Sequence, residues 1–280
     1  MLCAAVGTQG RLVEAERLAG ETVQLARREH GYRSEQHVQA LSQHARYLDT
    51  FGRYEQAVLA TERALLVLKQ LILPPSHEAY TSGFLLFQFG EAELQGKPLR
   101  GNRLVKRYAE LLVDESKYSA KIPQFARNHE RAERFLTAAL DLFREVDGTD
   151  QTPEYNNARS ELARVYQDMQ EFEKAIELLE ACIRFQRSAQ QLQKPSIYEV
   201  ASLASDYLAL ARCYIHLKRL DDSEPYLDQA VDLYRQSLGE HHWRFADAVT
   251  EASYLASYRG DYEKALDFPQ QSTRVSHPIL

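Results

Sequence analysis

Apolar residues recur every three or four positions along most of the chain, as in the stretches SELARVYQDM and EFEKAIELLEACIRF. This spacing places them on one face of an α-helix. No stretch alternates apolar and polar residues as a half-buried strand does, and no Asn-Gly or Asp-Gly pair joins two such stretches into a hairpin. The pattern predicts an all-α protein.

The predicted helices follow one repeated frame of positions. The reference position of each repeat is a residue at the turn between its two helices, called the marker below. A bulky apolar residue lies two positions after each marker, small residues lie five and twelve positions after it, and another small residue lies seven positions before it. Such a unit is two helices around a tight turn, since glycine accepts positive φ where a helix ends and small residues let two helices approach closely. The five markers are Gly10, Gly52, Gln170, Lys218 and Gly260.

This frame of small residue, aromatic, glycine, aromatic and two alanines resembles the tetratricopeptide repeat. Gly10 and Gly52 lie 42 residues apart, as do Lys218 and Gly260, and this length is similar to the extended repeat of kinesin light chains. The segments 31–57 and 223–265 carry the resemblance most clearly. It implies a right-handed α-solenoid of antiparallel helix pairs, one domain over 1–280 with about six repeats.

The frame breaks between Gly96 and Asn128, where Pro98 and Gly101 prevent an immediate second helix. It resumes with a marker at Arg127, which predicts a repeat whose first helix is displaced. We therefore expect an irregular basic insert over 97–126, helical in pattern near its centre. The segment 97–131 contains nine Lys and Arg residues but only four Asp and Glu residues. This segment is either a solvated linker helix or a docking surface for an acidic segment or a phosphate group, with three candidate residues: Arg103, Lys106 and Arg107.

In the family, positions thirteen, ten, nine, six and three residues before the marker face the concave groove and hold extended or helical peptides. The position six before the marker is arginine in three repeats and tyrosine in the fourth. Arginine binds carboxylates with two parallel hydrogen bonds, so the column would suit an acidic peptide or a C-terminal carboxylate. The alternative is that each arginine pairs with a groove acid such as Glu161 or Asp49 and stabilises the solenoid. The peptide-binding candidates are Gln39, Gln43, Arg46, Asn157, Arg164, Arg212 and Tyr254, with Leu86 and Phe87 as an apolar pocket in the displaced repeat.

Composition narrows the function classes further. The 280 residues carry a net charge of −6, and this mild acidity argues against nucleic acid as a partner. Three cysteines without a CxxC pair argue against a disulfide framework or a zinc site and favour a reducing, cytoplasmic location. The sequence lacks a signal peptide and an apolar run of about 18 residues, so we expect no membrane insertion. No catalytic motif is present, and His241 and His242 fit a loop better than a metal site. We expect neither an enzyme nor a cofactor.

The leading hypothesis is a non-catalytic adaptor that binds a peptide segment, acidic in character, in its concave groove. The second is a structural subunit of a larger assembly, of the motor–cargo or cytoskeletal type, that docks through the basic segment 97–131. A third is an accessory domain of an enzyme whose catalytic part is another chain. Most of the first helix of repeat one is missing before Cys3, and Pro269 interrupts the last helix. We therefore expect a fragment or part of a complex, with a disordered tail over 269–280.

Overall fold

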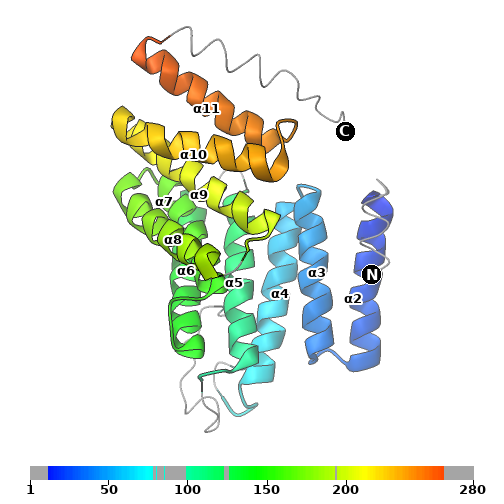
Figure 1. The fold of residues 1–280 in the computed structure, drawn as a ribbon. Coiled ribbons are helices and arrows are strands. Elements are labelled where there is room, and N and C mark those ends of the chain that lie inside the picture. The colour runs from blue at the N-terminus through cyan, green and yellow to red at the C-terminus, as the bar shows by residue number, and fades with distance from the viewer. Residues whose placement is uncertain are drawn as a thin grey trace. The chain divides into compact units, whose positions relative to one another are not determined.

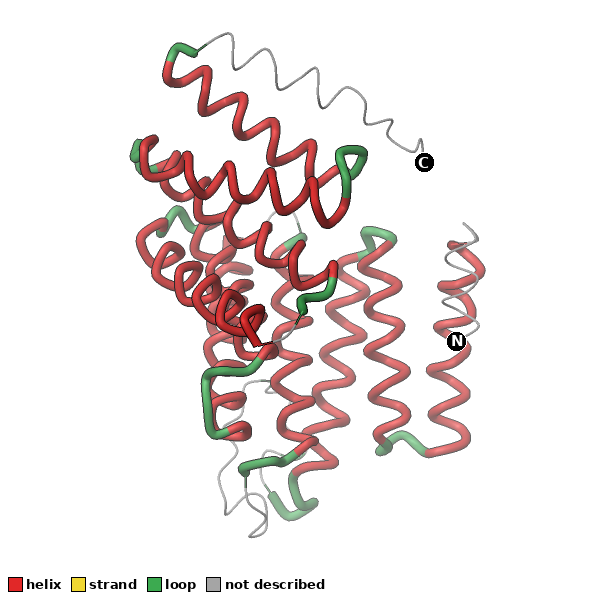
Figure 2. Tube along the Cα trace, in the orientation of Figure 1, coloured by secondary structure: helices red, strands yellow, loops and turns green. Residues whose placement is uncertain are grey.

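The computed structural model describes residues 12–77, 80, 85, 99–122, 126–192 and 194–261. Within these ranges all regular secondary structure is helical, joined by short turns (Figure 1, Figure 2). The chain divides into two compact units, Met1–Glu161 and Leu162–Leu280. Each unit is described by itself below. The predicted tail over 269–280 and the pocket residues Leu86 and Phe87 lie outside the described residues.

The first unit is a row of helices in which each packs against the next in the chain. Contacts join α2 to α3, α3 to α4, α4 to α5 and α5 to α6, and Figure 1 shows these helices side by side in chain order. Their bounds are α2 (Leu12–His30), α3 (Glu35–Thr50), α4 (Tyr54–Ile72), α5 (Arg103–Ala120) and α6 (Ala126–Asp147).

The second unit continues the same pairing of helices. Helix α7 begins in the first unit and ends in the second. Within the second unit, α9 contacts α8, α10 and α11, and α10 also contacts α11. One continuous core of leucines, alanines and tyrosines fills the space between these helices. Their bounds are α7 (Pro153–Asp168), α8 (Phe172–Leu192), α9 (Ile197–His216), α10 (Leu220–Leu238) and α11 (Trp243–Arg259).

The four markers within the described residues all end a helix in the same conformation. Gly52, Gln170, Lys218 and Gly260 have φ of 70°, 61°, 60° and 79°. The marker N–H bonds to the carbonyl three residues earlier, and the next N–H bonds to the carbonyl four residues before the marker, at distances of 2.8–3.1 Å. This pair of bonds is the Schellman motif, which satisfies the last carbonyls of a helix and favours glycine. The turn predicted from the repeated frame is therefore present at each of these markers.

The small residues of the frame lie where the helices approach most closely. Side chains five and twelve residues after Gly52, Gln170 and Lys218 have no exposed surface, and those seven before the four described markers are buried in three of the four repeats. A larger side chain at these positions would separate the two helices of a pair. The fully buried set is Ala57, Ala64, Ala175, Cys182, Ser223 and Ala230.

The centre of the predicted insert is a regular helix. Helix α5 begins after Asn102, whose side-chain oxygen accepts hydrogen bonds from the backbone N–H of Leu104 and Val105. It packs against α4 and α6 and buries Tyr108 and Leu112 among others. The helical pattern expected near the centre of the basic insert over 97–126 is therefore present as a regular helix, Arg103–Ala120. The reason is physical, since an apolar face at three and four spacing has to be covered.

Candidate functional site

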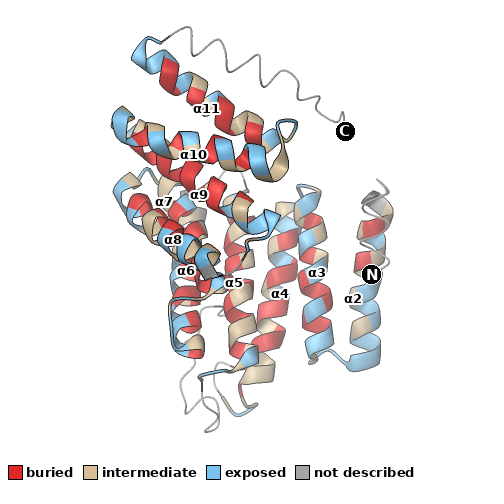
Figure 3. Ribbon diagram, viewed as in Figure 1, coloured by how far each residue is buried: buried red, intermediate tan, exposed pale blue. Residues whose placement is uncertain are grey.

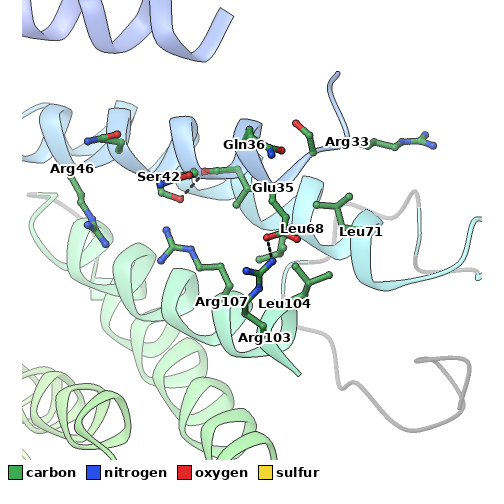
Figure 4. Close-up of a pocket in the computed structure, with 14 residues that line it drawn as sticks. Arg33, Glu35, Gln36, Ser42, Arg46, Leu68, Leu71, Arg103, Leu104 and Arg107 are labelled. Carbon is green, nitrogen blue, oxygen red and sulfur yellow. Dashed lines mark hydrogen bonds and ion pairs between the residues drawn. The ribbon is translucent and has the colours of Figure 1, made fainter. Parts of the chain in front are cut away.

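A hollow of about 850 Å³ opens between α3 and α5, with α4 beneath it. This hollow, called the α3–α5 hollow below, lies within the first unit (Figure 4). Its described lining comes from the turn before α3, from α3 itself, from the last turns of α4 and from the first turns of α5. The lining residues are Arg33, Ser34, Glu35, Gln36, Val38, Gln39, Ser42, Gln43, Arg46, Leu68, Leu71, Arg103, Leu104 and Arg107.

Helix α3 brings three of the predicted peptide-binding residues into this hollow. Gln39, Gln43 and Arg46 follow one another at spacings of four and three, so they share one face of the helix. That face is exposed, whereas Leu41 and Ala45 on the other side are buried (Figure 3). The buried face holds α3 in place and leaves the polar face turned toward the open space.

Helix α5 contributes two of the three predicted docking residues to the same hollow. Arg103 and Arg107 are one turn apart at its start, and both line the hollow together with Arg46. Lys106 lies outside it and forms ion pairs with Asp147 and Glu154, at 3.1 and 3.2 Å. The structure thus brings together residues that the sequence placed in two separate sites, a groove and a basic insert.

The lining is strongly basic, since it holds four arginines and one carboxylate, Glu35. Glu35 accepts a hydrogen bond from Arg103 Nη2 at 2.6 Å. Two further acids border the hollow from α5: Glu110 contacts Arg107 Nη1 at 2.6 Å, and Asp114 lies 3.8 Å from Arg46 Nη2. Burial raises the pKa of Asp114 above its ordinary value, against the opposing effect of nearby arginines and Lys117. With these two border acids included, the four arginines of the lining still outnumber the three carboxylates.

The floor of the hollow is apolar, and sequence reasoning did not find it. Leu68 and Leu71 come from the last turns of α4, and Leu104 comes from the first turn of α5. Arg33, in the turn before α3, was also missed, and its guanidinium lies 5.0 Å from the ring centre of Tyr80. Groove positions counted from a marker fall only on first helices, so the count could not reveal residues from α4 or from the preceding turn.

Asn157, also predicted to bind peptide, lies on α7 and contacts α5. Lys117 on α5 lies 3.5 Å from Asn157 Oδ1 and 3.4 Å from a carboxylate oxygen of Glu161. A similar pair joins Lys121 to Asp49 of α3 at 2.6 Å. Lysines of α5 therefore link this helix to predicted groove positions on α7 and on α3.

The remaining predicted contacts belong to the second unit. Arg212 on α9 forms ion pairs with two acids of α11, Glu251 at 2.8 Å and Asp247 at 3.0 Å. Arg164 is exposed, and its Nη2 lies 3.2 Å from Ser205 Oγ on α9. Tyr254, on the same face of α11 as the two acids, is 59% exposed. Arg212 therefore has internal acidic partners, as the alternative interpretation of the arginine column expected, while Tyr254 projects into solvent.

Other candidate chemistry is sparse in the part of the chain that the structure describes. It shows no group of three or more His, Cys, Asp or Glu side chains placed to hold a metal ion. His242 caps α11, because its Nδ1 accepts a hydrogen bond from the N–H of Arg244. Cys182 and Cys213 are buried thiols that form no disulfide with each other, and burial raises the pKa of the Cys213 thiol to about 11. None of the helices described combines the length and the apolar character needed to cross a bilayer.

The solved structures most useful for comparison are helical repeat proteins. BtubC (BKLC) from P. vanneervenii has a TM-score of 0.64 and 16% identity, and the match covers 96% of this chain and 94% of that one. A putative kinesin light chain from Podosopora anserina with nearly identical TPR-like repeats gives 0.56 and 16%, covering 85% and 93%. A Rap protein complexed with competence and sporulation factor gives 0.59 and 14%, covering 86% of this chain and 54% of that one. At these identities the likeness concerns the fold.

No curated protein matches the sequence. The family description Tetratricopeptide repeat matches residues 120–188 and 200–276, just over half of the chain. With the all-helical structure and the similar solved structures, this confirms the expected fold class, an α-solenoid of helix pairs. The chain belongs to the tetratricopeptide repeat family.

Proposed function

We propose that this chain is a non-catalytic, cytoplasmic adaptor that binds a segment of a partner protein, and that the segment is acidic and lies in the α3–α5 hollow. The observation that carries the proposal is the lining of that hollow. It combines predicted groove residues of α3 with Arg103 and Arg107 of α5 over an apolar floor. Repeat proteins of this class use extended concave surfaces for binding.

The size and chemistry of the hollow suit a peptide. Its volume of about 850 Å³ falls within the range of small-ligand sites, about 300–1,000 Å³. Gln39 and Gln43 carry amides that can both donate to and accept from a peptide backbone. Arg46 and Arg107 can hold carboxylates with paired hydrogen bonds. An extended acidic segment with an apolar side chain would use all three features.

One comparison supports a binding role at the level of the fold. The similar Rap protein was solved in complex with competence and sporulation factor. A related helical architecture therefore accommodates a bound factor. The lining of the α3–α5 hollow is the sole support for the proposed position of the ligand on this chain.

The second candidate function, docking of a structural subunit through 97–131, draws on the same arginines. Arg103 and Arg107 face the hollow, and Lys106 is engaged with Asp147 and Glu154. Deleting this segment would remove α5 and its buried side chains from the core, so the loss of binding would not identify the docking surface. Single substitutions of exposed arginines are the appropriate test.

The test is a selection of 12-residue peptides from a random display library on the full chain, followed by affinity measurement. We expect the selected peptides to be rich in Asp and Glu and to bind at least tenfold more weakly to Arg46→Gln. Arg63→Gln provides the matched control, because Arg63 is an exposed arginine of α4 outside the hollow. Selection of neutral or basic peptides, or equal binding by the Arg46 and Arg63 variants, would contradict the proposal.

A further inference from the structure

The α3–α5 hollow holds more arginine than a single carboxylate requires. Four guanidinium groups line it against one carboxylate, and they still outnumber the acids when Glu110 and Asp114 at its border are included. Resting on the proposed function, we infer that the bound segment is phosphorylated. In this assignment a phosphoserine or phosphothreonine of the partner protein lies between Arg46 on α3 and Arg107 on α5.

Charge is the first argument for a phosphate group. A phosphoserine side chain carries roughly −1.5 to −2 at neutral pH and has three strong acceptor oxygens, whereas a carboxylate carries a single charge. Two arginines from different helices can each supply donors to such a group. A carboxylate has two acceptor oxygens, which a single guanidinium fork can satisfy, whereas the three oxygens of a phosphate can accept from Arg46 and Arg107 together.

Geometry is the second argument. Arg46 and Arg107 come from the two walls of the hollow, and Figure 4 shows both side chains extending into the space between α3 and α5. Arg107 contacts Glu110 through Nη1, and Arg46 lies 3.8 Å from Asp114, a long separation for an ion pair. A guanidinium group has five N–H donors, so each of these arginines can keep its acidic neighbour and still turn other donors toward a tetrahedral group placed between them.

The apolar floor identifies the class of molecule that carries the phosphate. Leu68, Leu71 and Leu104 lie in the same hollow as the arginines. A peptide can present a phosphate and an apolar side chain a few residues apart. The backbone of RNA offers phosphates without such a side chain, and a lipid headgroup at a membrane surface would not enter a hollow of this kind with its acyl chains. We therefore assign a phosphorylated protein segment as the occupant.

The experiment uses the full chain and peptide arrays in which each random sequence is made in three matched forms. The central residue is serine, phosphoserine or glutamate, and the tightest binders are then measured in solution by fluorescence anisotropy. We expect the phosphoserine form to bind at least tenfold more tightly than both others. Affinity for it should fall at least tenfold in Arg46→Gln and in Arg107→Gln and stay within twofold in Arg63→Gln. Circular dichroism of each variant confirms folding.

The pH dependence gives an independent readout. The second pKa of a phosphate ester is about 6, so lowering the pH from 7.5 to 5.5 removes much of its second charge. Affinity for the phosphoserine peptides should therefore fall several-fold over this range. The glutamate peptides keep their charge there and serve as the control for changes in the protein itself.

The outcomes separate this inference from the proposed function. Equal affinity for phosphoserine and glutamate peptides overturns the inference and leaves an adaptor for acidic segments. Absence of binding to every acidic and phosphorylated peptide overturns both. Unchanged affinity in the Arg46 and Arg107 variants places the site elsewhere and overturns the inference, as does tighter binding of RNA or of anionic lipid vesicles than of any phosphopeptide.

Discussion

Arg131 on α6 lies 2.6 Å from a carboxylate oxygen of Glu115 on α5, and that carboxylate is completely buried. Arg131 also pairs with Glu62 on α4. One arginine thus joins three consecutive helices of the first unit and serves two acids. Burial raises the pKa of Glu115 to about 7, with Glu62 adding to the rise and Arg131 opposing it.

This arrangement predicts an unusual dependence of stability on pH. The folded pKa of Glu115 exceeds its unfolded value, so between about pH 4.5 and 7 the folded state binds more protons than the unfolded state. The contribution of Glu115 to the free energy of unfolding therefore increases as the pH falls through 7 and is complete below about 4.5. The expected size is of the order of 1–3 kcal/mol.

The measurement is urea denaturation of the wild type and of Glu115→Gln at pH values from 5 to 8. His37 and His44, whose pKa values are lowered by burial, act in the opposite direction in both proteins. The relevant quantity is therefore the difference between the two proteins. The wild type should lose stability relative to Glu115→Gln as the pH rises, and a difference that is independent of pH would refute this account of Glu115.

The second prediction concerns the two non-glycine markers. Gln170 and Lys218 have φ near 60°, a conformation that costs an L-residue roughly 1 kcal/mol and costs glycine little. Gln170→Gly should therefore raise the free energy of unfolding by about 0.5–1 kcal/mol. Glu177→Gly, an exposed position inside α8, should lower it by about 1 kcal/mol. Thermal denaturation followed by circular dichroism distinguishes the two signs, and destabilisation by Gln170→Gly would be inconsistent with the turn described above.

The third prediction concerns the small residues between paired helices. Cys182 is fully buried at a position where two other repeats have alanine, Ala64 and Ala230. Cys182→Ala should change the free energy of unfolding by less than about 1.5 kcal/mol, since the frame accommodates alanine. Cys182→Leu should cost at least 1–3 kcal/mol through overpacking. Equal stability of the two variants in chemical denaturation would show that the helices do not approach closely there.

The fourth prediction separates the arginines of the second unit. Arg212 pairs with two acids of α11, while Arg164 is exposed and contacts Ser205. Arg212→Ala should lower the free energy of unfolding by about 1–2 kcal/mol, because it leaves Asp247 and Glu251 without their partner. Arg164→Ala should cost less than about 0.5 kcal/mol. If melting curves place the larger loss in Arg164→Ala, the roles assigned to these two arginines are reversed.

The sequence was sufficient to predict the turns and the helix pairs because the frame depends on local requirements. A positive φ at Gly52 and buried alanines at fixed distances from it follow from helix geometry and close packing. The α3–α5 hollow was not predictable in the same way. Its lining depends on α5 packing next to α4. The repeated frame is broken between these two helices, and the length of the break does not indicate where the next helix packs. Gln39, Gln43 and Arg46 were identified from the frame, whereas Leu68 and Leu104 required the packed structure.

The central claim is that the α3–α5 hollow holds a segment of a partner protein. Hydrogen–deuterium exchange of the full chain, with and without a saturating selected peptide, tests it most directly. The account predicts slower exchange at 33–46 and 103–107, where the walls of the hollow lie, and unchanged exchange in α8 and α10. Protection confined to the second unit, or absent from both walls of the hollow despite tight binding, would contradict it.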